Sequence, residues 1–471
     1  MKKFRGLTYL YLIFDFLGSA ATWTLFNIFR KKYVESQLYG IDLTFHPDLK
    51  FVLGLLFFPL FWISLFGIAG FYQKILRKTR LKEFGMSLGF TIIGSLILFF
   101  MLLLDDYIVS YKTYYIILLS LFVLEFVLTY IPRVILTTRI VHNIHNRKIG
   151  FPTLIVGNGE KAISTINELN AEKKSQGFKV VGYIKTSEGT DSLSNILPEL
   201  GTIKNITQVI TDNNIEEVIL ATDSENTEEL KAIFNVLIPL NVSIKATPSM
   251  YDILIGRVKM SGILNAPLLS ISFELLSPWQ ANLKELTDYM LSLLAIILLS
   301  PLAVVLAITI KLTSKGPIIF KQERIGQYGK PFTLYKFRSM YVDAENGGPA
   351  LSSKSDNRVT PIGRFMRKTR LDEIPNFYNV FRGDMSLVGP RPERQFYIDQ
   401  IVKVAPHYIH LQKVKPGITS WGQVKYGYAE NVEQMTERLR YDLLYLENMS
   451  LFVDFKIMIY TILTVFRGKG V

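Results

Sequence analysis

The chain has 471 residues, which is enough for two to four domains, and its 49% hydrophobic and 13% aromatic content is high for a purely soluble protein. The absence of cysteine excludes disulfide bonds and thiol chemistry, and the net charge of +13 favours anionic lipids or phosphorylated substrates as partners. No basic tail or nucleic-acid motif accompanies this charge, so we expect no nucleic-acid partner.

Four apolar segments come first and each approaches the roughly 20 residues that span a bilayer core. They lie near Leu7–Phe29, Phe51–Phe71, Gly85–Leu104 and Tyr114–Ile131. Four such segments leave too little polar surface for a soluble domain, so they predict four transmembrane helices. Lys and Arg gather before the first helix, between the second and third, and after the fourth, which places both ends of this region in the cytoplasm.

Two acidic residues, Asp15 and Glu125, lie inside the first and fourth of these helices. An ionisable residue within a membrane helix is a functional candidate by default. We favour a structural interpretation, in which both side chains face other helices of the bundle.

A soluble α/β unit is predicted from Phe151 onward. PTLIVGNGEKAISTINEL is typical of a strand, a glycine turn and a helix, with Gly157, Gly159 and Ala162 in the form GxGxxA. Further strands are expected to end near Ile184, Thr222 and Pro248 and to form a parallel sheet. Lys185 occupies the place where a dinucleotide-binding fold would carry its ribose-binding acid, so a regulatory or scaffolding role is favoured over cofactor binding.

The segment Tyr289–Ile310 contains 22 residues without a charge and is long enough to span a membrane. Ser300 and Pro301 interrupt its middle, and an interior proline kinks or breaks a helix. Basic residues follow its end and indicate a cytoplasmic exit, and the preceding domain is also expected in the cytoplasm. We therefore predict a re-entrant segment that turns at Ser300–Pro301, whose serine can satisfy backbone groups freed by the proline.

The stretch from Arg364 to Pro392 reads RFMRKTRLDEIPNFYNVFRGDMSLVGPRP and has adjacent carboxylates, Asp372 and Glu373, near its centre. Many cations surround them, as expected at a site that handles phosphate, where a carboxylate can attack phosphorus or hold a metal. The candidate phosphate-binding and substrate-binding cations are Lys336, Arg338, Arg370 and Arg391. Lys336 and Arg338 are two residues apart after a predicted strand, which would place them on one face.

These residues belong to a run, LDEIPNFYNVFRGDMSLVGPRP, that resembles the signature of the monotopic phosphoglycosyl transferases, bacterial sugar transferases that start glycan assembly on a polyprenyl phosphate. The segments KLTSKGPIIFKQERIGQYGKPFTLYKFRSM and KPGITSWGQV also resemble this family, so the likeness covers about residues 284 to 471. This region carries 26 Lys and Arg residues against 17 Asp and Glu residues, which suits anionic substrates and lipids.

The resemblance implies a chain with four transmembrane helices, a Rossmann-like parallel-sheet domain, and a C-terminal α/β catalytic domain on a re-entrant membrane helix. We expect the transmembrane region at residues 1–140, the Rossmann-like domain at 141–250, a connector at 251–283 and the catalytic domain at 284–471, with the re-entrant helix at 285–312. The implied location is the bacterial inner membrane, with the catalytic domain on its cytoplasmic face. An oligomeric state is left open.

The resemblance also implies the reaction, a transfer of sugar-1-phosphate from a nucleotide-diphosphate sugar, expected to be a UDP-sugar, to undecaprenyl or another polyprenyl phosphate. Asp372 would act as nucleophile; spacing alone does not separate it from Glu373. Mg²⁺ would bridge phosphate oxygens, with Glu373 as its first protein contact and Asp372 beside it. The product would begin exopolysaccharide, capsule or O-antigen assembly.

Two alternatives belong to other classes. A membrane-bound nucleotide-sugar dehydratase or epimerase would carry YxxxK in the region of its Rossmann-like domain. The tyrosines between residues 151 and 280 are Tyr183 and Tyr251, and the residues four positions after them are Ser187 and Ile255, not lysine. A non-catalytic membrane scaffold for glycan assembly would not need the pair of Asp372 and Glu373 with its arginines. Release of nucleotide distinguishes the scaffold from the transferase.

Overall fold

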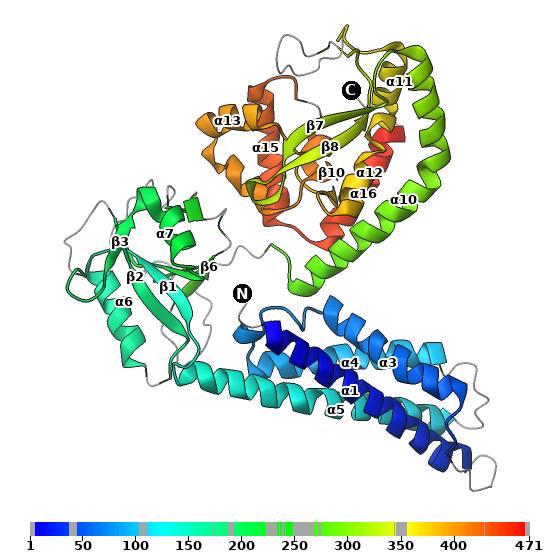
Figure 1. The fold of residues 1–471 in the computed structure, drawn as a ribbon, viewed down its shortest axis with the longest axis vertical. Helices are drawn as coiled ribbons and strands as arrows, with labels where there is room; N and C mark the ends of the chain where they lie inside the picture. Colours follow the sequence, from blue (N-terminus) through cyan, green and yellow to red (C-terminus); the bar gives the residue numbers. More distant parts are fainter. Residues whose placement is uncertain are drawn as a thin grey trace. The chain divides into compact units, whose positions relative to one another are not determined.

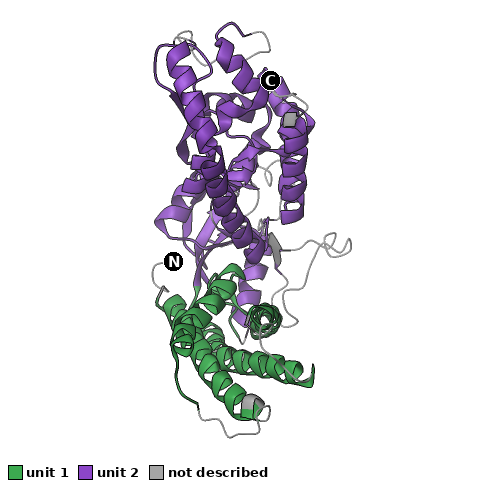
Figure 2. Ribbon diagram, turned by 90° about the vertical axis from the view of Figure 1, so that its right-hand side faces the viewer, with its two compact units in different colours: residues 1–150, 173–177 green, residues 151–172, 178–471 purple. Residues whose placement is uncertain are grey.

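The computed structural model divides the chain into two compact units (Figure 2), Met1–Gly150 with Lys173–Gly177 and Phe151–Glu172 with Phe178–Val471. The residues that it describes are 5–36, 45–102, 111–172, 174–186, 193–222, 233–234, 236–237, 240, 242–247, 268–271, 275–342, 344, 356–427 and 429–466. Most of the predicted connector, residues 251–283, therefore lies outside the described residues.

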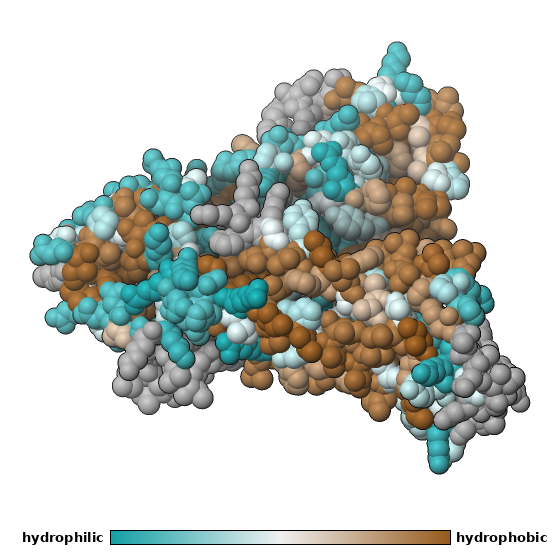
Figure 3. Space-filling model, turned by 60° about the horizontal axis from the view of Figure 1, so that its bottom comes forward, coloured by the Kyte–Doolittle hydropathy of each residue, from teal (hydrophilic) through white to brown (hydrophobic). Residues whose placement is uncertain are grey.

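The first unit is a bundle of long helices (Figure 1), formed where the sequence predicts apolar spans. Its elements are α1 (Arg5–Phe29), η2 (Arg30–Glu35), α3 (Leu49–Ile68), η3 (Ile75–Arg77), α4 (Arg80–Leu102) and α5 (Tyr111–His145). Large apolar side chains such as Leu17, Phe57 and Met101 are exposed on the outside, and hydrophobic residues dominate this surface in Figure 3. In the described part of the chain, five helices are long and apolar enough to cross a membrane. Four are α1, α3, α4 and α5, and the fifth, Pro278–Thr313, belongs to the second unit.

A buried ion pair joins the first and last helices of the bundle. The Arg133 guanidinium donates from Nε to Asp15 Oδ1 and from Nη2 to Asp15 Oδ2, both at 2.8 Å, and both side chains are fully buried. Tyr72 Oη donates to the same carboxylate at 2.8 Å. The Phe66 and Phe71 rings lie 3.9 and 4.4 Å from the guanidinium carbon, so aromatic faces complete its surroundings.

The second intramembrane acid, Glu125, is also buried between these helices. Its Oε1 accepts a hydrogen bond from Ser19 Oγ at 2.7 Å. Next to Ser19, Gly18 allows a close approach, since a Cβ there would lie 2.9 Å from the Leu128 carbonyl oxygen. The prediction that Asp15 and Glu125 contact other helices is confirmed.

The second unit begins with a six-stranded sheet in the order β3-β2-β1-β4-β5-β6. All neighbouring strands are parallel except β5 and β6, which confirms the parallel arrangement predicted for β1, β2, β4 and β5; β3 was not predicted. The strands are β1 (Phe151–Val156), β2 (Phe178–Lys185), β3 (Glu199–Thr202), β4 (Glu217–Leu220), β5 (Ser243–Ala246) and β6 (Leu269–Ile271), with α6 (Glu160–Ala171), η4 (Ile203–Asn205) and α7 (Ile206–Asp212) between them.

Packing accounts for the first glycine of the GxGxxA turn. Gly157 has φ +136°, and a Cβ on it would collide with the Ala221 carbonyl after β4. The next residue, Asn158, is buried and accepts from the Thr186 hydroxyl at 2.8 Å, which links this turn to the end of β2. The motif thus has a structural explanation that needs no bound dinucleotide.

A single long helix, α10 (Pro278–Thr313), leads into the C-terminal region (Figure 1). The later elements are β7 (Ile319–Ile325), η5 (Gln327–Gly329), β8 (Pro331–Phe337), α11 (Pro361–Thr369), η6 (Leu371–Glu373), α12 (Asn376–Arg382), β9 (Ser386–Val388), α13 (Gln395–Val404), η7 (Pro406–Lys413), β10 (Gly417–Thr419), α14 (Trp421–Lys425), α15 (Val432–Glu447) and α16 (Leu451–Phe466). β7 and β8 form an antiparallel hairpin, and β9 pairs in parallel with β10.

Helix α10 continues through the proline at its centre. Pro301 has no N–H to donate to the carbonyl four residues earlier, that of Ile297, and Ser300 Oγ donates to this carbonyl at 2.8 Å instead. The predicted role of Ser300 is confirmed. The expected turn at Ser300–Pro301 is not a break in the helix, and the re-entrant path stays a prediction.

The Asp15–Arg133 pair predicts a stability effect. Asp15→Asn should lower the free energy of unfolding by about 3 to 5 kcal/mol, because it leaves a buried guanidinium without its counter-charge. Arg133→Met should cost a similar amount, and the double variant should regain part of the loss because no unpaired charge remains. Thermal unfolding in detergent micelles measures all three, and unchanged midpoints for both single variants would contradict the prediction.

Candidate active site

The two adjacent carboxylates lie on a short 3-10 turn, η6, between two helices. α11 begins at Pro361, preceded by Thr360, whose hydroxyl accepts from the Gly363 N–H at 3.0 Å as an N-cap. It ends where Arg370 adopts a left-handed conformation with φ 56°. The next helix, α12, starts directly after Pro375.

Apolar packing fixes this turn from both sides. Leu371 before the carboxylates and Ile374 after them pack against the hydrophobic cluster that contains Leu306 and Ile310 of α10 together with Phe337. The turn therefore rests on the C-terminal half of the long apolar helix. Asp372 and Glu373 are held by their apolar neighbours in the LDEI sequence rather than by a flexible loop.

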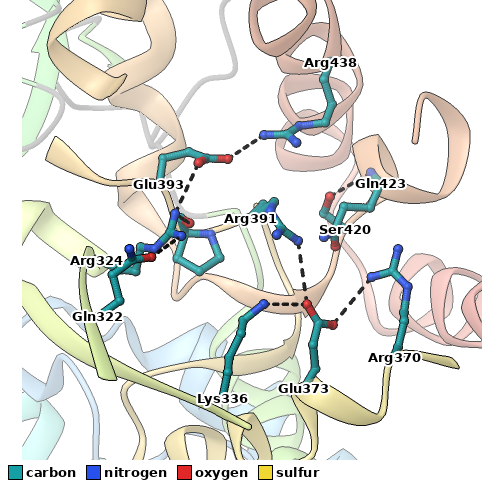
Figure 4. A network of polar contacts seen from close by, with 11 residues as sticks. Gln322, Arg324, Lys336, Arg370, Glu373, Arg391, Glu393, Ser420, Gln423 and Arg438 are labelled. Carbon is teal, nitrogen blue, oxygen red and sulfur yellow. Dashed lines mark hydrogen bonds and ion pairs between the residues drawn. The ribbon is translucent and has the colours of Figure 1, made fainter. Parts of the chain in front are cut away.

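Glu373 is the counter-charge for three cations (Figure 4). Its carboxylate lies 2.8 Å from Lys336 Nζ, 3.5 Å from an Arg370 nitrogen and 3.9 Å from an Arg391 nitrogen. Burial alone would raise the pKa of Glu373, but the charges of Lys336, Arg370 and Arg391 outweigh burial and lower it to about 2. Three of the four predicted phosphate-binding cations thus converge on one carboxylate.

Asp372 differs from its neighbour in its environment. Its side chain is buried, with 8% of the residue exposed, and it takes part in no ion pair among the described residues. Burial raises the pKa of Asp372, against the lowering effect of Lys336, while the charge of Glu373 raises it further. Two carboxylates one residue apart therefore have opposite pKa shifts, an arrangement typical of groups with different chemical roles.

A second polar network holds the loop that carries Arg391 (Figure 4). Glu393, two residues later, is buried and bonded to Arg438 at 2.6 Å. Arg324 donates to the Pro392 carbonyl at 3.1 Å, and the Ile325 N–H donates to the Glu393 carbonyl at 3.0 Å. Sequence reasoning missed Glu393 and Arg438, because no local pattern relates two residues 45 positions apart.

Arg338 does not join the cluster around Glu373. β8 ends at Phe337, so strand alternation does not extend to Arg338, and its Nη2 donates to Ser314 at the end of α10. The expected shared face of Lys336 and Arg338 depended on a strand that continues through Arg338, and β8 ends one residue before it. Among the described residues, Arg338 forms no ion pair with Asp372 or Glu373.

A small, shallow recess lies beside Glu373. Its polar lining combines Lys336, Glu373 and Arg391 with Arg324 and Asn376. Three basic side chains in one recess provide the donors that phosphate oxygens require. The arrangement can hold an anionic group close to the Asp372–Glu373 turn.

The carboxylates at this site could hold a cation such as Mg²⁺ only if substrate phosphates or water also coordinate it. In the part of the chain that the structure describes, no group of three His, Cys, Asp or Glu side chains could hold a metal ion. Two adjacent carboxylates are the protein share that Mg²⁺ usually takes when substrate phosphates and water complete its coordination. Since Glu373 already faces three cations, Asp372 is the carboxylate with more free coordination capacity.

Comparisons with known proteins match two parts of the chain to known families. Residues 279–468 match the family described as bacterial sugar transferase, and residues 67–248 match the family described as CoA-binding domain. The first range contains α10, the η6 turn, all three cations around Glu373 and the Glu393–Arg438 pair.

Individual relatives are similar over different lengths. A UDP-N-acetylgalactosamine-undecaprenyl-phosphate N-acetylgalactosaminephosphotransferase of Aeromonas hydrophila is 41% identical over 219 residues, which cover 46% of this chain and 51% of the relative. A UDP-glucose:undecaprenyl-phosphate glucose-1-phosphate transferase of Klebsiella pneumoniae is 35% identical over 62% of each chain. An undecaprenyl-phosphate galactose phosphotransferase of Salmonella typhimurium is 31% identical over 68% of each chain. The chain belongs to the bacterial sugar transferase family.

Proposed function

We propose that this protein transfers a sugar-1-phosphate from a UDP-sugar to polyprenyl phosphate and releases UMP. The observation that carries the proposal is the pair of unlike carboxylates, a buried Asp372 without an ion pair beside a Glu373 that gathers three cations. The printed names of the relatives, which pair UDP-sugars with undecaprenyl phosphate, support the same reaction. The sugar itself is left open.

In the first step, an Asp372 oxygen attacks the sugar-proximal phosphorus of the donor. The bond from that phosphorus to the bridging oxygen breaks, UMP leaves with the electron pair, and a phosphosugar remains on the aspartate. Lys336, Arg370 and Arg391 are placed to stabilise the charge on the phosphoryl oxygens. Glu373 keeps these cations together before the donor binds.

In the second step, a phosphate oxygen of the polyprenyl phosphate attacks the same phosphorus. The bond between phosphorus and Asp372 breaks, which restores the carboxylate and gives polyprenyl-diphospho-sugar. No oxidant or further reactant is needed. In this proposal the reaction takes place at the cytoplasmic face of the bacterial inner membrane, where a re-entrant α10 would carry the η6 turn.

Mg²⁺ forms part of the proposal, and when bound it would neutralise charge on the diphosphate of the donor. Asp372 and Glu373 are the carboxylates available to hold it with the substrate phosphates. The protein's own contribution is to place Glu373 in a recess lined by cations, with Asp372 next to it in the chain.

Replacement of the nucleophile tests the reaction. Asp372→Asn should reduce UMP release from UDP-sugars by at least ~10³-fold, because the amide cannot form the phosphoryl ester. Asp399→Asn is the matched control, since it makes the same chemical change on the exposed face of α13. Substantial residual activity in Asp372→Asn would reject Asp372 as nucleophile. Absence of release by the wild type from UDP-, CDP-, GDP- and dTDP-sugars would reject the enzyme and favour a scaffold.

The pH dependence of the first step is a second test. Because the pKa of Asp372 is raised, the carboxylate is protonated at a higher pH than an ordinary aspartate, and the rate should fall below an apparent pKa higher than that of an ordinary aspartate. Glu373→Gln removes a charge that raises the pKa of Asp372, so the acid limb of its residual activity should move to lower pH. The UMP burst is measured by rapid quench in the absence of polyprenyl phosphate, so that titration of the acceptor phosphate does not affect the pH profile. An acid limb at the ordinary pKa would contradict the prediction.

Removal of divalent cations tests the metal. UMP release should stop in excess EDTA and return when Mg²⁺ is added, because the diphosphate then regains its charge neutralisation. Calorimetric binding of UDP-sugar to Asp372→Asn, with and without Mg²⁺, gives a readout that does not depend on turnover. Equal affinity and equal release with and without the metal would exclude a role for it.

A further inference from the structure

Asn376, the first residue of α12, carries a side-chain amide that the described part of the protein does not use. Only 3% of the residue is exposed, and its Oδ1 is a buried acceptor without a hydrogen-bond partner. Its Nδ2 likewise donates to no described residue. Because buried polar groups nearly always have partners, a free amide in this position calls for an explanation.

The other asparagine of α12 shows what a purely structural amide does in the same helix. Asn379 is fully buried, its Nδ2 donates to the Thr333 carbonyl at 2.7 Å, and its Oδ1 accepts from the Tyr335 N–H at 3.1 Å. Both amide atoms of Asn379 therefore hold α12 against β8. Asn376 is similarly buried but makes neither kind of bond, so the attachment of α12 to the hairpin does not explain its amide.

The recess beside Glu373 gives a ligand access to this amide. Asn376 is part of the wall of that recess, together with Lys336, Glu373 and Arg391. The terminal torsion of an asparagine side chain is broad and roughly twofold, so rotation about it can turn either amide atom toward the recess. The free amide therefore borders the space that the donor phosphates are proposed to enter.

Asn376 also lies close to the nucleophile along the chain. The η6 turn continues through Ile374 and Pro375, both in the right-handed helical conformation, directly into α12. Asn376 follows Asp372 by four positions, and this spacing places two residues on the same side of a helical segment. A group bonded to the phosphorus that Asp372 attacks would therefore come near Asn376.

The chemistry of the amide selects the kind of ligand group. Cations in the recess suit phosphoryl oxygens, which at neutral pH accept hydrogen bonds and do not donate them. The free Oδ1 of Asn376 needs a donor, and a hydroxyl can both donate to Oδ1 and accept from Nδ2. The sugar of the donor carries hydroxyls and is bonded to the attacked phosphorus, whereas the ribose hydroxyls lie beyond the second phosphate.

We propose that Asn376 binds a hydroxyl group of the sugar that is transferred and contributes to the selection of that sugar. The inference rests on the proposed function and deepens it, because it assigns a protein contact to the sugar itself. The cations at Glu373 hold the diphosphate of any nucleotide sugar, so they do not distinguish one sugar from another. A neutral amide beside them can distinguish sugars by the position of a hydroxyl.

Comparison of UDP-sugar with UDP separates a contact to the sugar from a contact to the rest of the donor. Calorimetry in the Asp372→Asn background, with the UDP-sugar that the wild type uses best, measures binding without turnover. Asn376→Ala should weaken UDP-sugar binding by about threefold to tenfold, the factor for one neutral hydrogen bond, and should leave UDP binding unchanged. Asn376→Gln keeps the amide and should recover part of the affinity. Equal weakening of both ligands, or of neither, would overturn the inference.

Deoxy analogues of the UDP-sugar identify the hydroxyl. Removal of the contacted hydroxyl should weaken binding when Asn376 is present and have little further effect in Asn376→Ala, because its partner is then already absent. Removal of any other hydroxyl should have the same effect with and without the amide. Additive losses for every deoxy analogue would show that Asn376 contacts none of these hydroxyls.

Two control variants separate binding from stability. Asn448→Ala removes an exposed amide at the end of α15 and should leave both affinities unchanged. Asn379→Ala should lower the thermal midpoint, because it removes the bonds to β8. An equally lowered midpoint in Asn376→Ala, with no recovery in Asn376→Gln, would leave Asn376 as a structural residue. Absence of UMP release by the wild type from every nucleotide sugar would instead reject the proposed function.

Discussion

The charge balance at Glu373 is the interaction on which the site depends. Lys336, Arg370 and Arg391 come from a strand, a helix end and a loop, and without a shared counter-charge they would repel one another. One carboxylate pairs with all three and remains ionised because they surround it. Asp372, next in the chain, stays outside these ion pairs, which leaves its carboxylate available for chemistry.

This charge cluster keeps its place because apolar packing holds the turn that carries it. Leu371 and Ile374 pack on the same cluster as Leu306 and Ile310, so the C-terminal half of α10 supports the acidic pair directly. At the other end of the helix, Lys284 donates to the Val388 carbonyl and pairs with Asp454, while Asp288 accepts from the Leu387 N–H. A helix long and apolar enough for a membrane is therefore also the foundation of the candidate active site.

Several polar groups inside apolar surroundings are matched with specific partners. Asp15 and Arg133 form an ion pair within the helical bundle. Ser300 donates a hydrogen bond to the Ile297 carbonyl, which Pro301 cannot reach with an N–H. Arg338 donates to Ser314 at the end of α10, while its other two nitrogens are buried without a hydrogen-bond partner.

The sequence by itself determined the apolar helices, the βα order of the parallel sheet and the adjacent carboxylates, because these features follow from local periodicity and composition. Its run of arginines indicated a phosphate site but did not show which cations would meet. Only the tertiary structure brought Lys336 to Glu373 across 37 positions, paired Glu393 with Arg438, and directed Arg338 to Ser314. The physical reason is that ion pairs between distant segments depend on where strands and turns are packed, which no local pattern records.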